Sequence, residues 1–186
     1  MINVLIPLAQ GCEELEAITL IDLLRRAGIQ VVTAGLDEQV VTASRGTRLI
    51  PDTSLDKVVQ QEFDMVVLPG GQPGADNLNA DPRIHALLKH TVERGKLTAA
   101  ICAAPTVLAK AGLLDSKRAT GYPGFLDKLN LPTTTLEDQA VVVDGPVVTS
   151  KGPGTAMDFA LTLIELLVGK ETRDEVEKAL QRPVGS

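Results

Sequence analysis

The stretch LTAAICAAP, residues 97–105, decides the fold, because it joins a short apolar run to a cysteine, two alanines and a proline. Leu97 to Ile101 is predicted to be a buried strand, and Pro105 suits the first turn of a helix that continues to Leu114. Cys102 is therefore expected on a tight elbow. Unpaired N–H groups at a helix start favour a thiolate, which makes Cys102 a candidate nucleophile. The alternative is a buried cysteine that packs as a small apolar side chain.

Strands and helices alternate outward from this elbow. Strands are expected over 2–6, 30–34, 64–68 and 97–101, and helices over 13–27, 82–94, 105–114, 155–168 and 172–180. Two hairpins are expected, over 40–50 and 140–150; the first could extend the sheet or make a dimer contact. The alternation predicts an α/β fold with a doubly wound, mostly parallel sheet sandwiched by helices. Sites in such folds lie at the carboxyl ends of strands near a switch point.

Length and composition limit the classes of function. The 186 residues suit a single domain spanning 1–186. A net charge of −6, without a dense Lys/Arg cluster, disfavours direct nucleic-acid binding. No apolar run approaches the roughly 20 residues that span a bilayer, so no membrane association is expected. No signal-like segment follows Met1, so a cytoplasmic protein is expected, in which Cys12 and Cys102 are free thiols.

A glutamate and a glycine pair are the further candidates for the site. Glu16 shares a helix face with Leu20 and Leu23, so burial is expected to raise its pKa and make it a hydrogen-bond donor or proton shuttle. The first helix starts at the same sheet edge as Cys102, where a protonated Glu16 could stabilise the thiolate. Gly70-Gly71 could offer N–H groups to an oxyanion there. The alternatives are a partly exposed acid at a helix end and an ordinary tight turn.

The remaining motifs do not predict a metal, phosphate or cofactor site. His85 and His90 lie five residues apart, which is not one helical face, so no metal site is expected and both are interpreted as solvated. Gly152-Pro153-Gly154 lacks the residues of a phosphate or dinucleotide motif and is interpreted as a helix start near the site wall. No cofactor is expected.

Four motifs together carry a resemblance over essentially the whole chain. They are GCEELEA (11–17), VVLPGG (66–71), AAICAAP (99–105) and TSKGPGTAMDFAL (149–161), and they resemble the ThiJ/PfpI superfamily, in the branch of the Parkinson-disease protein deglycase (DJ-one) and its bacterial YajL-like members. The resemblance implies a flavodoxin-like fold, a homodimer, a nucleophile elbow at Cys102 and a protonated Glu16. It also implies that the backbone amides of Gly70, Gly71 and Ala103 line the site, and that Arg45 reaches it across the dimer interface.

Two departures from related subgroups narrow the function. PfpI-type proteases carry a histidine where this chain has Ala103, and the distal His-x-Glu pair of amidotransferases is missing, so proteolysis and glutamine hydrolysis are disfavoured. Many members of the deglycase branch place a histidine before a proline where this chain has Tyr122. The Tyr122 hydroxyl could hydrogen-bond a substrate oxygen but is a poor base near neutral pH.

The residue set and the resemblance together imply cysteine-dependent, cofactor-free handling of reactive carbonyls. The expected substrates are small dicarbonyls, with methylglyoxal converted to lactate in a glyoxalase III-like lyase reaction, or glycated protein side chains in a deglycase-type hydrolase reaction. Cys102 would be the nucleophile and Glu16 the proton shuttle. The alternative is an oxidative-stress sensor or redox-regulated chaperone that works through oxidation of Cys102. Cys12 would then be a resolving partner or merely a small loop residue.

Overall fold

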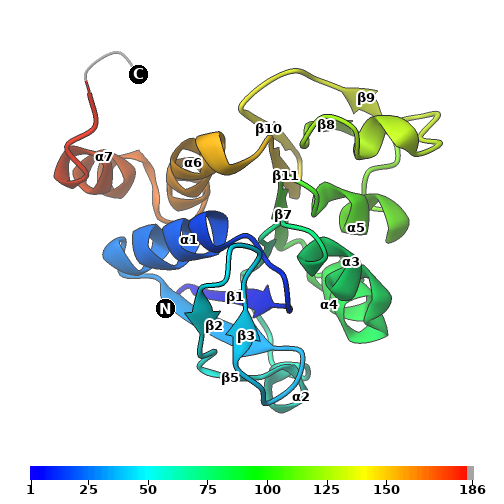
Figure 1. Ribbon diagram of the computed structural model, residues 1–186. Helices are drawn as coiled ribbons and strands as arrows, with labels where there is room; N and C mark the ends of the chain where they lie inside the picture. The colour runs from blue at the N-terminus through cyan, green and yellow to red at the C-terminus, as the bar shows by residue number, and fades with distance from the viewer. Residues whose placement is uncertain (184–186) are drawn as a thin grey trace.

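The computed structural model describes residues 1–183, and a seven-stranded sheet forms the centre of this part of the chain (Figure 1). The strand order is β10-β11-β7-β6-β1-β2-β5, and β10 alone runs antiparallel to its neighbour. The strands are β1 Asn3–Leu8, β2 Gln30–Gly35, β5 Thr53–Ser54, β6 Met65–Leu68, β7 Leu97–Ile101, β10 Val141–Asp144 and β11 Val147–Ser150. The predicted doubly wound, mostly parallel α/β architecture, which is flavodoxin-like, is confirmed.

Helices cover both faces of the sheet (Figure 1). One face carries α1 Glu14–Arg26, α6 Ala156–Val168 and α7 Lys170–Ala179; the other carries α2 Leu55–Val58, α3 Gly74–Ala80, α4 Pro82–Glu93 and α5 Pro105–Lys110. The buried residues on both faces are mostly Val, Leu, Ile and Ala, as the low aromatic content requires. Each face of the sheet therefore has its own apolar layer, and the carboxyl ends of the strands stay free for loops.

Most predicted elements occur within a few residues of their expected bounds. The strand before Cys102 is Leu97–Ile101 as predicted, and Asp81 caps α4 by accepting a 2.9 Å hydrogen bond from the Arg83 N–H. Helix α5 stops at Lys110 rather than 114, because Gly112 adopts φ +76°, outside the helical region. The helix α3 was not predicted, since its sequence GADNLNA reads as turn-forming; Ala75 and Leu78 stabilise it by burial.

Two short two-stranded sheets lie outside the main sheet, one antiparallel and one parallel. The first pairs β3 Val41–Thr42 with β4 Arg48–Leu49, so the predicted hairpin exists but does not extend the central sheet. It sits on the loop after β1 instead, because the Gly11 N–H donates to the Thr42 carbonyl at 2.8 Å. The second pairs β8 Arg118–Ala119 with β9 Thr135–Leu136, near the 3-10 helix η1 Leu126–Lys128.

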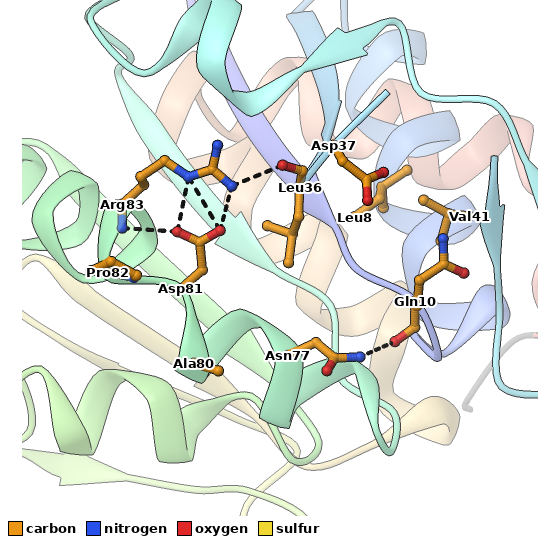
Figure 2. A pocket seen from close by; sticks show the side chains of 10 residues that line it. All are labelled: Leu8, Gln10, Leu36, Asp37, Val41, Asn77, Ala80, Asp81, Pro82 and Arg83. Carbon is orange, nitrogen blue, oxygen red and sulfur yellow. Dashed lines mark hydrogen bonds and ion pairs between the residues drawn. The ribbon is translucent and has the colours of Figure 1, made fainter. Parts of the chain in front are cut away.

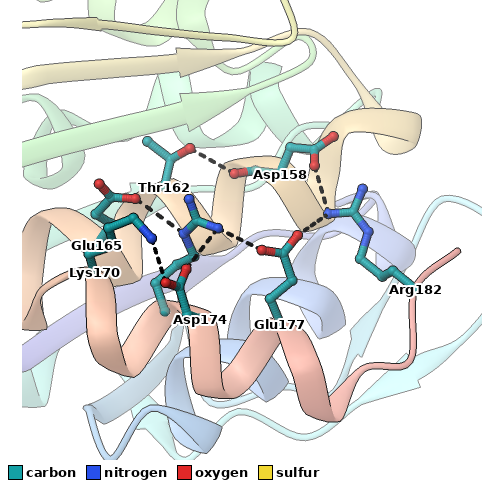
Figure 3. Close-up of polar contacts among 8 residues, drawn as sticks. Asp158, Thr162, Glu165, Lys170, Asp174, Glu177 and Arg182 are labelled. Carbon is teal, nitrogen blue, oxygen red and sulfur yellow. Dashed lines mark hydrogen bonds and ion pairs between the residues drawn. The ribbon is translucent and has the colours of Figure 1, made fainter. Parts of the chain in front are cut away.

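The C-terminal helix α7 is tied to α6 by ion pairs (Figure 3). Arg173 contacts Glu165 of α6 at 3.2 Å and Glu177 of its own helix at 2.6 Å, and Arg182 contacts Asp158 at 2.8 Å. A short 3-10 helix, η2 Pro153–Thr155, leads into α6. Within residues 1–183, no helix combines the length and apolar character needed to cross a membrane.

Candidate active site

The candidate site forms where the chain changes direction across the sheet. After β1 the chain builds β2 and β5 on one side, and it then returns to place β6 and β7 on the other side of β1. The loops after β1 and β6 therefore diverge to opposite faces, which opens a crevice at the carboxyl ends of these strands. The first of these loops leads into α1, and the second carries Gly70 and Gly71. Cys102 follows β7 at the same edge.

Cys102 occupies the predicted elbow. Its backbone φ of +66° lies in the left-handed region, which residues other than glycine rarely adopt. The surrounding structure must therefore hold the backbone in this conformation. The Cys102 N–H donates to the Ser150 carbonyl at 3.0 Å, and the Cys102 carbonyl accepts from the Tyr122 N–H at 2.8 Å. The residue is 8% exposed, so only a small part of it is open to solvent.

Glu16 is fully buried and lies beside Cys102, as the topology predicted. The Glu13 side chain caps α1 by accepting from the Glu16 N–H at 2.9 Å, which fixes Glu16 in the first helical turn. The Glu16 Oε2 atom accepts a hydrogen bond from the Gly70 N–H at 2.8 Å, whereas Glu16 Oε1 is buried without a hydrogen-bond partner within residues 1–183. Burial raises the pKa of Glu16 to about 7, although hydrogen bonds from the Gly70 N–H and the Cys102 thiol act to lower it.

Opposing influences act on the ionisation of Cys102. Burial and the negative charge of Glu16 raise the pKa of the Cys102 thiol, whereas the N–H groups of Gly71 and Ala103 donate to the sulfur and lower it. The expectation that helix amides favour an anionic sulfur stays a prediction. Cys102 and Glu16 each affect the pKa of the other, so the two groups titrate as a pair between which a proton can pass.

The two glycines differ in what they offer the site. The Gly70 N–H donates to Glu16 and so positions the acid; the expected oxyanion role of Gly70 stays a prediction. A Cβ at Gly70 would lie 2.7 Å from the Cys102 Cβ and 2.9 Å from Glu16 Oε2, so this position requires glycine for close approach. Gly71 adopts φ +90°, and its backbone N–H donates to the Cys102 sulfur, as the Ala103 N–H does.

Tyr122 and Arg45 occupy the margins of the site. Tyr122 is 47% exposed, its ring packs edge-on against Phe125, and a Cβ at Gly152 would lie 3.1 Å from Tyr122 Cδ2. The Gly152-Pro153-Gly154 segment therefore borders the site wall, as predicted. Arg45 is exposed on the turn between β3 and β4, and its guanidinium makes no hydrogen bond or ion pair within residues 1–183.

Glu14 has a structural part that its sequence position did not reveal. Its carboxylate accepts hydrogen bonds from the N–H groups of Arg45 and Thr47 and from the Ser44 hydroxyl, and so holds the turn that carries Arg45. Partial burial acts to raise the pKa of Glu14, but a hydrogen bond from its own backbone N–H, together with those from Arg45, Thr47 and Ser44, lowers it to about 2. The sequence indicated only an acid that complements the helix dipole, because the turn is thirty residues away in the chain.

The remaining candidates lie apart from this chemistry. Cys12 is fully buried in the loop after β1, and burial, followed by the charges of Glu14 and Glu13, raises its pKa to about 12. It forms no disulfide in the part of the chain described. A ring nitrogen of His85 hydrogen-bonds the Asn79 carbonyl at 2.9 Å, so His85 is not simply solvated, whereas His90 is exposed. Residues 1–183 hold no cluster of three or more metal-binding side chains.

Comparison with known proteins places this geometry in a family. Residues 2–166 match the DJ-1/PfpI family. Protein DJ-1 homolog A of Arabidopsis thaliana is 45% identical over 180 residues, which cover 96% of this chain and 46% of that protein, so the chain spans about half the length of this relative. The glutathione-independent glyoxalase DJR-1.2 of Caenorhabditis elegans is 40% identical over 171 residues, covering 92% of this chain and 91% of that protein.

A solved structure agrees with the same assignment. The crystal structure of Drosophila melanogaster DJ-1beta superposes with a TM-score of 0.94 at 45% identity, covering 98% of each chain. The family match covers most of the residues, and it includes the elbow, the glycine pair and Glu16. The chain therefore belongs to the DJ-1/PfpI family.

Proposed function

We propose that this protein converts small reactive dicarbonyls, with methylglyoxal as the test substrate, into hydroxy acids without a cofactor. The observation that carries the proposal is the contact between the Cys102 thiol and the Glu16 carboxyl, beside the N–H groups of Gly71 and Ala103. The glyoxalase name of the Caenorhabditis elegans relative supports the substrate class. Glycated protein side chains, which carry adducts of the same dicarbonyls, are the proposed larger substrates.

The proposed reaction begins with proton transfer. The ionised Glu16 accepts the thiol proton as the Cys102 sulfur forms a bond to the aldehyde carbon of methylglyoxal, and the N–H groups of Gly71 and Ala103 donate to the developing oxyanion. Glu16 then gives the proton that it took from the thiol to the hemithioacetal oxygen, which regenerates the ionised carboxylate for the next step. Glu16 is suited to this transfer because its carboxyl is buried beside the sulfur.

The second half of the reaction moves a hydrogen within the substrate. Glu16 removes the proton on the former aldehyde carbon and returns a proton to the neighbouring carbonyl carbon, which gives a lactoyl thioester on Cys102. Water then adds to the thioester, the C–S bond breaks, and lactate and the free thiol are released. The overall change is methylglyoxal plus water to lactic acid, so oxidation of one carbon balances reduction of the other.

Purified protein should form lactate from methylglyoxal, and Cys102→Ser should abolish this activity because the hydroxyl is a weaker nucleophile. Cys12→Ala is the matched control, since Cys12 is buried in a neighbouring loop and should be dispensable. Enzymatic lactate assay measures both variants. Equal rates in Cys102→Ser and the unmodified protein would refute the proposed nucleophile.

We further propose a cytoplasmic homodimer in which Arg45 acts on the partner's site. The exposed apolar residues Leu15 and Ile18 of α1 support a covered face, because they lie within one helical turn of Glu14, which holds the Arg45 turn. The Arg45 guanidinium makes no hydrogen bond or ion pair within residues 1–183, which supports a role outside its own chain. Placement in the bacterial YajL-like branch, and organisation as one domain, stay predictions.

A further inference from the structure

A cavity of about 580 Å³ lies away from Cys102 and Glu16, between the end of β2, the strand β3 and the corner of α3 and α4 (Figure 2). Its volume is in the range of cavities that hold small organic molecules. Neither reactive residue of the candidate active site lines it. The lining residues are Leu8, Gln10, Leu36, Asp37, Val41, Asn77, Ala80, Asp81, Pro82 and Arg83.

The inner part of this cavity is apolar. Leu8 and Val41 are almost fully buried at the cavity wall, and Leu36 packs against the opposite apolar layer of the sheet. Leu36 is half-buried and Ala80 and Pro82 are exposed, so these three side chains can cover a short alkyl chain. Burying that chain would be favourable through removal of apolar surface from water. The cavity therefore suits a ligand with an apolar body.

Each side-chain donor group around the cavity makes at least one hydrogen bond to the protein. Arg83 donates to Asp81, to Asp56 and, at 2.8 Å, to the Leu36 carbonyl. The side-chain amide of Asn77 donates to the Gln10 carbonyl at 2.8 Å. The side-chain amide of Gln10 donates to the Val40 carbonyl at 2.9 Å and accepts from the Thr42 N–H at 2.8 Å.

Asp37 and Asn77 each keep an acceptor atom that has no partner in the described part of the chain. Asp37 uses one carboxylate oxygen to accept from the Gln39 N–H at 2.8 Å, and its other oxygen has no partner within residues 1–183. The Asn77 Oδ1 likewise accepts no hydrogen bond in that part of the chain. Figure 2 shows Asp37 above and Asn77 below the apolar side chains. The charge of Asp81 is balanced by Arg83, so Asp37 carries the uncompensated charge.

We propose that this cavity binds a small organic cation, namely a protonated amine or guanidine on a short alkyl chain. The alkyl chain lies against Leu36, Ala80 and Pro82, and the cationic head donates to Asp37 and to Asn77 Oδ1. An anionic head is disfavoured because the Asp37 carboxylate repels it and Arg83 is already paired with Asp81. This binding is separate from the carbonyl chemistry at Cys102.

The test uses n-butylguanidinium as the probe and butyrate as a control of the same alkyl size and opposite charge. Binding is followed by two-dimensional NMR of ¹⁵N-labelled protein, in which the Asn77 side-chain amide and the Gly11 N–H should shift and saturate. The second arm of the test uses an acetylated arginine amide, which mimics an arginine side chain of a protein. If it binds more tightly than n-butylguanidinium, the ligand of the cavity is a protein side chain. If it binds more weakly, the ligand is a free small cation.

Two charge-matched variants decide the outcome. Asp37→Asn should weaken binding about tenfold or more, because it removes a hydrogen bond to a charged group. Glu38→Gln removes the same charge from a neighbour that pairs with Lys57 and does not line the cavity, so it should bind normally. Methylglyoxal turnover should be unchanged in both. Absence of saturable shifts, equal binding of butyrate, or equal loss in Glu38→Gln would overturn the proposal.

Discussion

At the scale of single residues, the chemistry depends on one buried acid and one buried thiol that share a proton. Burial and the negative charge of Glu16 raise the pKa of Cys102, and the N–H groups of Gly71 and Ala103 lower it, so the ionisation of this sulfur depends on the acid beside it. The same environment suits a thiol that is deprotonated only as it attacks, by a base in direct contact. Glu16, with a pKa of about 7, is poised for that task near neutral pH.

The rate of methylglyoxal turnover should rise with pH as Glu16 ionises. A general base works in its deprotonated form, and the pKa of Glu16 is about 7, so kcat/KM should increase through pH 7 and then level. Glu16→Gln should be nearly inactive and should lose this rise. Steady-state rates between about pH 5 and pH 9 test it; a profile that falls through pH 7 would instead indicate that protonated Glu16 is the active form.

The same carboxyl should make folding stability depend on pH. Its pKa is raised from 4.5 to about 7 in the folded state, so the stability it contributes is fully present below 4.5 and is lost as the pH rises through 7. The loss is up to about 3 kcal/mol at 1.36 kcal/mol per pKa unit. Urea unfolding should show a smaller loss in Glu16→Gln. An identical loss in the variant would assign the titration to another group.

At the scale of elements, the short β3–β4 hairpin is held to α1 by one carboxylate. Glu14→Gln should loosen the turn at Arg45 and cost about 1 to 2 kcal/mol locally, since hydrogen bonds to a charged acceptor are replaced by weaker ones. Hydrogen exchange of the Arg45 and Thr47 amides should then be faster. In the unmodified protein, protection should be present above pH 4.5 and lost as the pH falls towards 2.

Equal exchange rates in Glu14→Gln and the unmodified protein would show that other contacts hold the turn. Glu175→Gln is a suitable control, because this glutamate lies on α7 and not on the hairpin or the α1 turn beneath it. Glu175→Gln also removes one negative charge, and its effect on the hydrogen exchange rate of the Arg45 amide should be negligible.

Local sequence signals explain which elements and residues were predictable. The strand Leu97–Ile101 and the helix from Pro82 follow from apolar runs and caps within a few residues. The meeting of Glu16 and Cys102 followed from topology, because both come after parallel strands. The raised pKa of Cys102 and the engaged Gly70 N–H did not follow, since desolvation and the reach of the Glu16 side chain depend on tertiary packing.

At the scale of the whole molecule, the proposed dimer can be tested by complementation. Cys102→Ser and Arg45→Ala homodimers should each be impaired. If Arg45 serves its partner, a mixed dimer regains one intact site, so random exchange restores about a quarter of normal site number. Methylglyoxal assays before and after mixing measure this. Failure to recover activity, with exchange verified by mass spectrometry, would place Arg45 in its own chain's site or outside catalysis.

The chain has one tyrosine and no tryptophan, and that tyrosine borders the elbow. Excitation near 280 nm therefore produces tyrosine emission from the residue whose backbone N–H donates to the Cys102 carbonyl, rather than an average over scattered fluorophores. Ligand arrival or covalent addition at that sulfur can be followed in the native protein by the intensity of this single phenol. The intrinsic fluorescence of this tyrosine therefore allows stopped-flow kinetics without an added label.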